Sequence, residues 1–154
     1  MAKATIRSNG FIYVPVHVKH RNLPNMLTRT YKVDTGANST TISRTWLEAL
    51  GYDAKWVLEN GKPTFPTSAS GAPIKDCYRI TLPEISIGDW IGGNWEFTVT
   101  LNAEIDFRLL LGTDTMQFFN WHIDYGNMSC VYNFIQSKRK LLSDDGKRYM
   151  YSVE

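Results

Sequence analysis

The sequence places a carboxylate, a hydroxyl, a glycine and a small residue in a row: Asp34, Thr35, Gly36 and Ala37. The apolar pattern before Asp34 predicts a strand, so the carboxylate stands where that strand enters a loop. Glycine lets another backbone approach closely, and a half-buried carboxylate at a loop mouth suits acid–base chemistry. The same residues could instead form an Asx-type turn without a catalytic role. Local chemistry alone leaves both interpretations open.

Two segments together resemble the hallmark motifs of retropepsin-like aspartic proteases. One is Tyr31–Ser43, which contains Asp-Thr-Gly, and the other is Leu109–Met116, an apolar triplet followed by glycine, one residue and an aspartate. They occur in the family's order, and the resemblance extends over about residues 8–135. The closest pattern is that of the protease domain of DNA-damage-inducible ubiquitin-shuttle proteins, a likeness that does not carry over the shuttle role.

The resemblance implies a role for each matching residue near the first motif. It implies that Asp34 is the catalytic aspartate and that the active-site loops are supported by Thr35, Gly36 and Gly112. Asp114 is expected to cap a short helix, which is a structural role. The chemistry of the family needs neither a metal nor an organic cofactor.

Substrate binding is implied for five residues: Gly36, Ala37, Asn38, Ser70 and Gly71. Ser70 and Gly71 belong to the expected flap at residues 67–73, which has one glycine and a proline near its tip. Asn38 stands where retroviral enzymes usually have an aspartate, so a charge is lost there.

The family's chemistry needs two aspartates facing one water, whereas this sequence has one Asp-Thr-Gly and no internal repeat. A C2 homodimer would supply Asp34 from each copy. Two carboxylates close together cannot both ionise cheaply, so the pair would hold one proton, one member acting as base and the other as acid. The expected partners are therefore a second copy of the chain and a polypeptide substrate.

The elements that must position these residues are mostly strands. Alternating apolar and polar residues predict strands at residues 11–18, 27–33, 95–101, 122–125 and 129–134. Capping patterns predict short helices at about 43–50 and at 115–119, while glycine and proline predict a loop at 59–73 and a turn at 92–94. The expected fold is all-β with one or two short helices, and the resemblance implies a closed β-barrel with one lobe per chain.

Length and charge limit the other possibilities. A chain of 154 residues predicts one domain, here residues 8–135, followed by a charged and solvated tail at 136–154. A net charge of +2 is too small for a protein that binds mainly to phosphates. No apolar run reaches the about 18 residues of a membrane helix, and the N-terminus lacks a secretory signal. We therefore expect no nucleic-acid or membrane partner and a cytoplasmic location.

Metal binding is not favoured by the few possible ligands. Strand positions three apart point to opposite faces, which separates His17 from His20, and neither His122 nor Cys77 belongs to a ligand pair. Cys77 and Cys130 lie far apart in sequence and are expected to be free, buried thiols.

Two other functions stay open at this point. The unusual flap and Asn38 are compatible with a non-catalytic peptide-binding or assembly module on the same fold. A carbohydrate-binding domain would use Trp90 and Trp95, of which Trp90 is the best candidate for an exposed ring.

Overall fold

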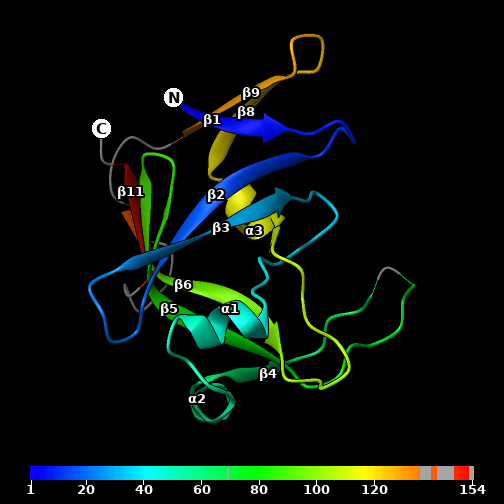
Figure 1. Ribbon diagram of the computed structural model, residues 1–154, viewed down its shortest axis with the longest axis vertical. Helices are drawn as coiled ribbons and strands as arrows, with labels where there is room; N and C mark the ends of the chain where they lie inside the picture. The colour runs from blue at the N-terminus through cyan, green and yellow to red at the C-terminus, as the bar shows by residue number, and fades with distance from the viewer. Residues whose placement is uncertain (69, 136–139, 142–147, 153–154) are drawn as a thin grey trace.

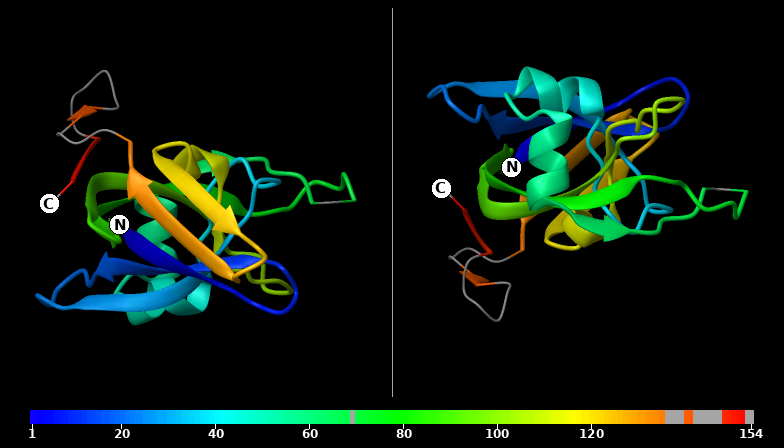
Figure 2. Two further views of the ribbon diagram at one scale, coloured as in Figure 1. Left: turned by 90° about the horizontal axis from the view of Figure 1, so that it is seen from above. Right: turned by 90° about the horizontal axis from the view of Figure 1, so that it is seen from below.

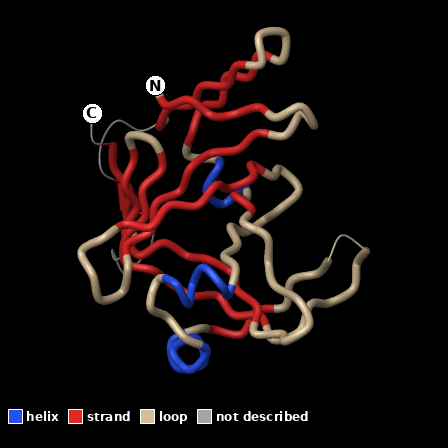
Figure 3. The backbone as a smooth tube through the Cα atoms, viewed as in Figure 1, coloured by secondary structure: helices blue, strands red, loops and turns tan. Residues whose placement is uncertain are grey.

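The structure is a computed structural model that describes residues 1–68, 70–135, 140–141 and 148–152. Strands dominate it, as Figure 3 shows. The strands are β1 (Ala2–Ile6), β2 (Ile12–Lys19), β3 (Met26–Val33), β4 (Lys62–Thr64), β5 (Cys77–Ile87), β6 (Trp90–Thr100), β7 (Leu110–Leu111), β8 (Phe119–Asp124), β9 (Ser129–Phe134), β10 (Lys140–Leu141) and β11 (Tyr149–Ser152). The helices are α1 (Arg44–Ala49), α2 (Ala54–Asn60) and α3 (Thr113–Met116). The mostly-β class is confirmed, with three short helices among the described residues rather than one or two.

The strands form one twisted sheet with the order β10-β11-β6-β5-β2-β1-β9-β8. Off this path, β3 pairs with β2 and β7, and β4 pairs with β5. Figure 1 shows the hairpin of β8 and β9 at one end of the molecule and the hairpin of β5 and β6 nearer the other. Among the described residues no pairing joins β8 back to β10, so the sheet is not closed into the barrel that we predicted.

The alternation that predicts a strand at residues 11–18 corresponds to β2. Val14, Val16 and Val18 are at most 1% exposed and form one wall of the core, while Pro15 on the opposite face is exposed. The remaining core side chains come largely from β5, β6 and α1. This core fixes β2, and β2 in turn holds β3, the strand that leads to Asp34.

Helix α1 begins where the capping pattern predicts. The Ser43 side chain accepts a hydrogen bond from the backbone N–H of Trp46 at 3.2 Å, and Trp46 and Leu47 are buried against the core. Helix α2 was not predicted, because its short amphipathic pattern precedes a segment rich in proline and glycine. Its N-terminus is capped by Asp53, whose side chain accepts from the N–H of Trp56 at 2.8 Å.

The predicted turn at Gly92-Gly93-Asn94 is wrong, because these residues lie inside β6. The chain reverses at Gly88 instead, which has a φ of +57°. At Gly92 a Cβ would stand 3.0 Å from the Trp95 ring, so the glycine provides close packing rather than a turn.

The predicted solvated tail is also partly wrong. Residues 149–152 form β11, which pairs with β6, and Met150 is fully buried. Residues 136–139, 142–147 and 153–154 of the predicted tail lie outside the described residues. No described helix has both the length and the apolar character needed to cross a membrane.

Candidate active site

The two motifs lie side by side because β3 and β7 pair in parallel. Lys32 is opposite Leu110 and Val33 is opposite Leu111 in this pairing. One residue later, the backbone N–H of Asp34 donates to the carbonyl of Leu111 at 3.0 Å. The backbone of Asp34 is therefore anchored at the point where β3 and β7 both end.

The turn after β3 fixes the orientation of the Asp34 side chain. Its Oδ1 accepts a hydrogen bond from the N–H of Gly36 at 2.9 Å, and the Asp34 carbonyl accepts from the N–H of Ala37 at 3.2 Å. Asp34 is half-buried, whereas Thr35 and Gly36 are exposed. The geometry is an Asx-type turn, and it presents a fixed carboxylate next to an accessible backbone. The structural and the chemical interpretations of this motif are thus compatible.

Gly112 lies directly beneath the loop that carries Asp34. A Cβ at Gly112 would stand 2.6 Å from both the carbonyl carbon and the carbonyl oxygen of Ser39. The next residue ties the same surfaces together, because the N–H of Thr113 donates to the carbonyl of Ala37 at 2.9 Å. Only a residue without a side chain permits this approach of β7 to the loop.

Asp114 does not cap α3, contrary to the expectation. The N-cap is Gly112, and Asp114 lies in the first turn of the helix. Its Oδ1 accepts from the Thr40 hydroxyl at 2.7 Å and its Oδ2 accepts from the Thr40 N–H at 3.1 Å. The Asp114 carboxylate bonds to Thr40 rather than to the N–H groups of its own helix, because the buried hydroxyl and N–H of Thr40 need an acceptor.

A chain of hydrogen bonds continues from Thr40 into the core. The Trp95 indole N–H donates to the hydroxyl of Thr115 at 3.0 Å, and the hydroxyls of Thr115 and Thr40 lie 2.8 Å apart. Because the Thr40 hydrogen is directed at Asp114, the Thr115 hydroxyl must donate to Thr40. Sequence reasoning missed Thr40, Thr115 and Trp95 in this role, since their partners come from distant segments.

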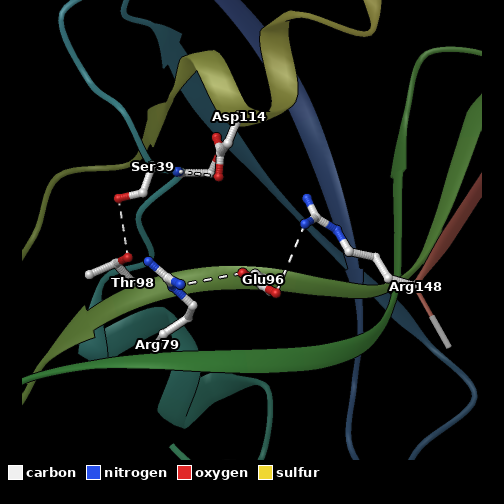
Figure 4. A network of polar contacts seen from close by, with 7 residues as sticks. Ser39, Arg79, Glu96, Thr98, Asp114 and Arg148 are labelled. Carbon is white, nitrogen blue, oxygen red and sulfur yellow. Dashed lines mark hydrogen bonds and ion pairs between the residues drawn. The ribbon is translucent and has the colours of Figure 1, made fainter. Parts of the chain in front are cut away.

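The loop that carries Asp34 is also attached to β6. Thr98 Oγ1 donates to Ser39 Oγ at 3.1 Å, as Figure 4 shows, and the Thr98 N–H donates to the Thr40 carbonyl at 2.9 Å. Asn38, the residue before Ser39, is exposed. The loop is therefore bonded to β7, α3 and β6 on its buried side, whereas its residues Thr35, Gly36 and Asn38 are exposed.

The expected flap residues form a tight turn of their own. Thr67 and Pro73 form an antiparallel bridge, and the Ser68 N–H donates to the carbonyl of Ala72 at 2.8 Å. Ser70 and Gly71 are exposed, and Gly71 has a φ of +84°. Figures 1 and 2 show this segment projecting from the body of the molecule on the side toward which the loop after β3 turns.

The remaining candidate residues do not join this site. Trp90 and Trp95 are fully buried, so the expectation of an exposed Trp90 is wrong and the two rings cannot form a sugar platform. Cys77 and Cys130 are free and buried, and burial raises the pKa of both thiols. Among the described residues, no three histidine, cysteine or acidic side chains are grouped so that they could hold a metal ion.

Comparisons with known proteins bear on the family and on the fold. A family model described as gag-polyprotein putative aspartyl protease matches residues 25–117, a span that contains both motifs. No curated protein matches the sequence. A crystal structure of a retropepsin-like aspartic protease from Rickettsia conorii has the same fold, with a TM-score of 0.58 and 19% sequence identity over 99% of this chain and 91% of that one. The narrower resemblance to DNA-damage-inducible proteins stays a prediction.

Proposed function

Since the chain belongs to the gag-polyprotein putative aspartyl protease family, we propose that it is an aspartic endopeptidase that acts as a homodimer. The observation that carries the proposal is the anchored Asp34. Its carboxylate is half-buried at the junction of the two motifs and is oriented by the N–H of Gly36. The chain contributes one such carboxylate, so a second copy must provide the other.

In the proposed dimer the two Asp34 carboxylates share one proton, because the repulsion between two neighbouring negative charges disfavours ionisation of both. The ionised carboxylate takes a proton from a water molecule as the water oxygen attacks the peptide carbonyl carbon. The protonated carboxylate donates its proton to the carbonyl oxygen. The tetrahedral intermediate then breaks its C–N bond. The leaving nitrogen takes the proton that the first carboxylate received from water, and a hydroxyl of the intermediate gives its proton to the second carboxylate, which yields a carboxyl and an amino product and again leaves one proton on the pair. No step draws on a metal or organic cofactor.

The proposed substrate is an extended polypeptide. Gly36 and Asn38 are exposed residues of the loop that carries Asp34, which we propose as the floor of the site, and Ser70 and Gly71 lie on the projecting segment that we propose as the flap. A chain lying between them would gain strand-like main-chain hydrogen bonds, and pockets for alternate side chains would provide selectivity. Thr35 is exposed beside Asp34, where it can contact the same loop of a second copy.

The proposal is tested by mass-spectrometric mapping of cuts in a denatured peptide library, at high protein concentration and from about pH 4 to about pH 7. We expect the wild type to cut and Asp34→Asn to leave the library intact, because asparagine keeps the acceptor for the Gly36 N–H but cannot act as base. Asp76→Asn is a matched control, since Asp76 is exposed and its φ of 57° is one that asparagine tolerates. If neither form cuts while both dimerise and bind peptide, the chain is the non-catalytic peptide-binding module.

A further inference from the structure

We infer that Trp95 is a positioning residue for the proposed reaction, because it holds the loop that carries Asp34 in place through the hydroxyl of Thr115. The inference rests on the proposed protease function. Trp95 lies in β6 and Thr115 in α3, and both side chains are completely buried. A buried side chain cannot meet a substrate, so an effect of Trp95 on the reaction must pass through the loop.

The connection from Trp95 to the loop consists of hydrogen bonds in series. The indole N–H of Trp95 donates to the Thr115 hydroxyl at 3.0 Å, and the hydroxyls of Thr115 and Thr40 lie 2.8 Å apart. The Thr40 hydroxyl in turn donates to Oδ1 of Asp114 at 2.7 Å. Thr40 belongs to the loop and follows Asp34 by six residues. The series therefore joins β6, α3 and the loop at one buried point.

The two ends of this series fix the direction of every bond in it. The indole N–H can only donate, and an ionised carboxylate can only accept. The Thr40 oxygen also accepts from the N–H of Gly112 at 3.2 Å, so its hydrogen and both of its lone pairs are in use. The Thr115 hydroxyl therefore donates to Thr40 and accepts from Trp95, and each bond requires the one before it.

The Trp95 N–H matters because Thr115 has other acceptors within its own segment. A threonine hydroxyl on a helix can bond to the backbone carbonyl three or four residues earlier. For Thr115 these carbonyls belong to Gly112 and Leu111, and the Leu111 carbonyl is the one that accepts the N–H of Asp34 at 3.0 Å. By holding the Thr115 oxygen beside Thr40, the indole N–H leaves the Leu111 carbonyl to Asp34.

The Trp95 ring is enclosed, so its N–H is a fixed donor. The ring meets Trp90 and Phe118 edge to face, with centroids 5.0 and 5.9 Å apart, and the guanidinium of Arg148 lies 4.3 Å from its centre. Gly92 permits this packing, since a Cβ there would stand 3.0 Å from the ring. A donor that cannot move with the loop resists any displacement of the loop.

The buried tryptophans differ in whether the indole N–H has a partner, which provides a matched control. Among the residues that the structure describes, the Nε1 atoms of Trp46 and Trp90 have no hydrogen-bond partner, whereas that of Trp95 has one. Trp90 packs against Trp95, so Trp46 is the cleaner comparison. It is buried in α1, the element that follows the loop. Trp46→Phe therefore removes the same chemical groups without interrupting the series that ends at Thr40.

The first test measures kcat and KM for peptide cleavage, at concentrations at which sedimentation shows the same fraction of dimer for every variant. Trp95→Phe and Thr115→Val should lower kcat about tenfold and leave KM within about twofold, because Asp34 shifts while the exposed surface of the loop is kept. Thr115→Ser keeps the hydroxyl and should recover most of the kcat that Thr115→Val loses. Trp46→Phe should keep the wild-type kcat. An equal loss in Trp46→Phe and Trp95→Phe, or no loss in Trp95→Phe and Thr115→Val, would overturn the inference.

Amide hydrogen exchange of the free proteins separates this inference from the proposed function, because it needs no substrate. The N–H groups of Ala37 and Thr40, which donate to the Asp34 carbonyl and to Asp114 Oδ2, report on the loop. Both should exchange faster in Trp95→Phe and Thr115→Val than in Trp46→Phe. Faster exchange together with a wild type that cuts no peptide would support the hold of Trp95 on the loop and contradict the protease. Cleavage by the wild type with unchanged exchange in both variants would overturn the positioning role and leave the protease standing.

Discussion

The hydroxyl of Thr40 donates to Oδ1 of Asp114 at 2.7 Å, and the backbone N–H of Thr40 donates to Oδ2 at 3.1 Å. This double contact joins the loop that carries Asp34 to the helix that follows Gly112, 74 residues further along the chain. Thr40 is 1% exposed, so water cannot easily replace the carboxylate. We infer that Asp114 positions the active-site loop without taking part in the reaction.

Replacing Asp114 should therefore destabilise the fold. Asp114→Ala leaves the Thr40 hydroxyl and N–H without their acceptor, and the free energy of unfolding should fall by about 1–3 kcal/mol. Asp114→Asn should lose less, because its amide oxygen still accepts one of the two bonds. Urea denaturation measures both changes, with Glu59→Gln on exposed α2 as a control expected within about 0.5 kcal/mol of wild type. An Asp114→Ala protein as stable as wild type would contradict this role.

Gly112→Ala should disturb the site through a steric clash. The added methyl would stand 2.6 Å from backbone atoms of Ser39, which cannot swing aside as a side chain can. We expect a loss of about 1–3 kcal/mol in unfolding free energy and a loss of peptide cleavage, because the loop must shift. Gly126→Ala is the matched control, since its Cβ would meet only the Asp124 side chain, at 3.3 Å. Equal stability of the two variants would show that the loop tolerates displacement.

Local patterns in the sequence predicted what depends on neighbouring residues. The alternation in β2 follows from one buried and one exposed face, and the Ser43 cap of α1 is satisfied three residues later. The meeting of Asp34 with the segment before Gly112 was accessible only through the family resemblance, because β3 and β7 are joined by a long-range parallel pairing. Nothing in the composition of either segment specifies that pairing.

The wrong predictions share a physical cause, which is a partner far away in sequence. Asp114 has the spacing of a capping box, yet the buried donors of Thr40 attract its carboxylate. Gly93 has turn composition, yet it lies inside β6 and makes room for the ring of Tyr149 on the distant strand β11. The strand β11 carries a weak apolar pattern, and its burial depends on the edge that β6 offers.

The pairing of β11 with β6 leads to a third prediction, which concerns the stability contributed by Met150. Its side chain is fully buried in the core, and its backbone lies opposite Gly92 in the β6–β11 pairing. Met150→Ala should lower the unfolding free energy by about 2–5 kcal/mol, the range for a large-to-small change in a core. Met26→Ala, at a position that is 37% exposed, should cost clearly less. A negligible effect of Met150→Ala in thermal or urea unfolding would return residues 149–152 to the solvated tail.

Tyr132 should make the protein sensitive to alkaline pH. Burial, assisted by the charge of Asp89, raises the pKa of Tyr132 to about 12. The unfolded chain ionises this phenol near the ordinary value of about 10, whereas the folded chain keeps it neutral. The resulting stability is complete below about pH 10 and is lost as the pH rises toward about 12. Tyr132→Phe should therefore lose less unfolding free energy than wild type between about pH 8 and about pH 11, and parallel losses would contradict the assignment.

The strongest consequence of one Asp34 per chain concerns mixtures of active and inactive copies. If a cut needs Asp34 from both members of a dimer, a mixed dimer of wild type and Asp34→Asn has only half of the pair. Random exchange between equal amounts of the two proteins leaves about one quarter of the dimers fully wild type, so activity per wild-type subunit should fall to about half.

Adding the same amount of Gly112→Ala or of an unrelated protein does not test this. The proper control is added wild type, which should instead hold or raise the activity per subunit, because higher concentration favours the dimer. Sedimentation of the same samples gives the fraction of dimer. Activity that is unaffected by Asp34→Asn in samples shown to exchange subunits would mean that one chain suffices, and the shared pair of carboxylates would have to be abandoned.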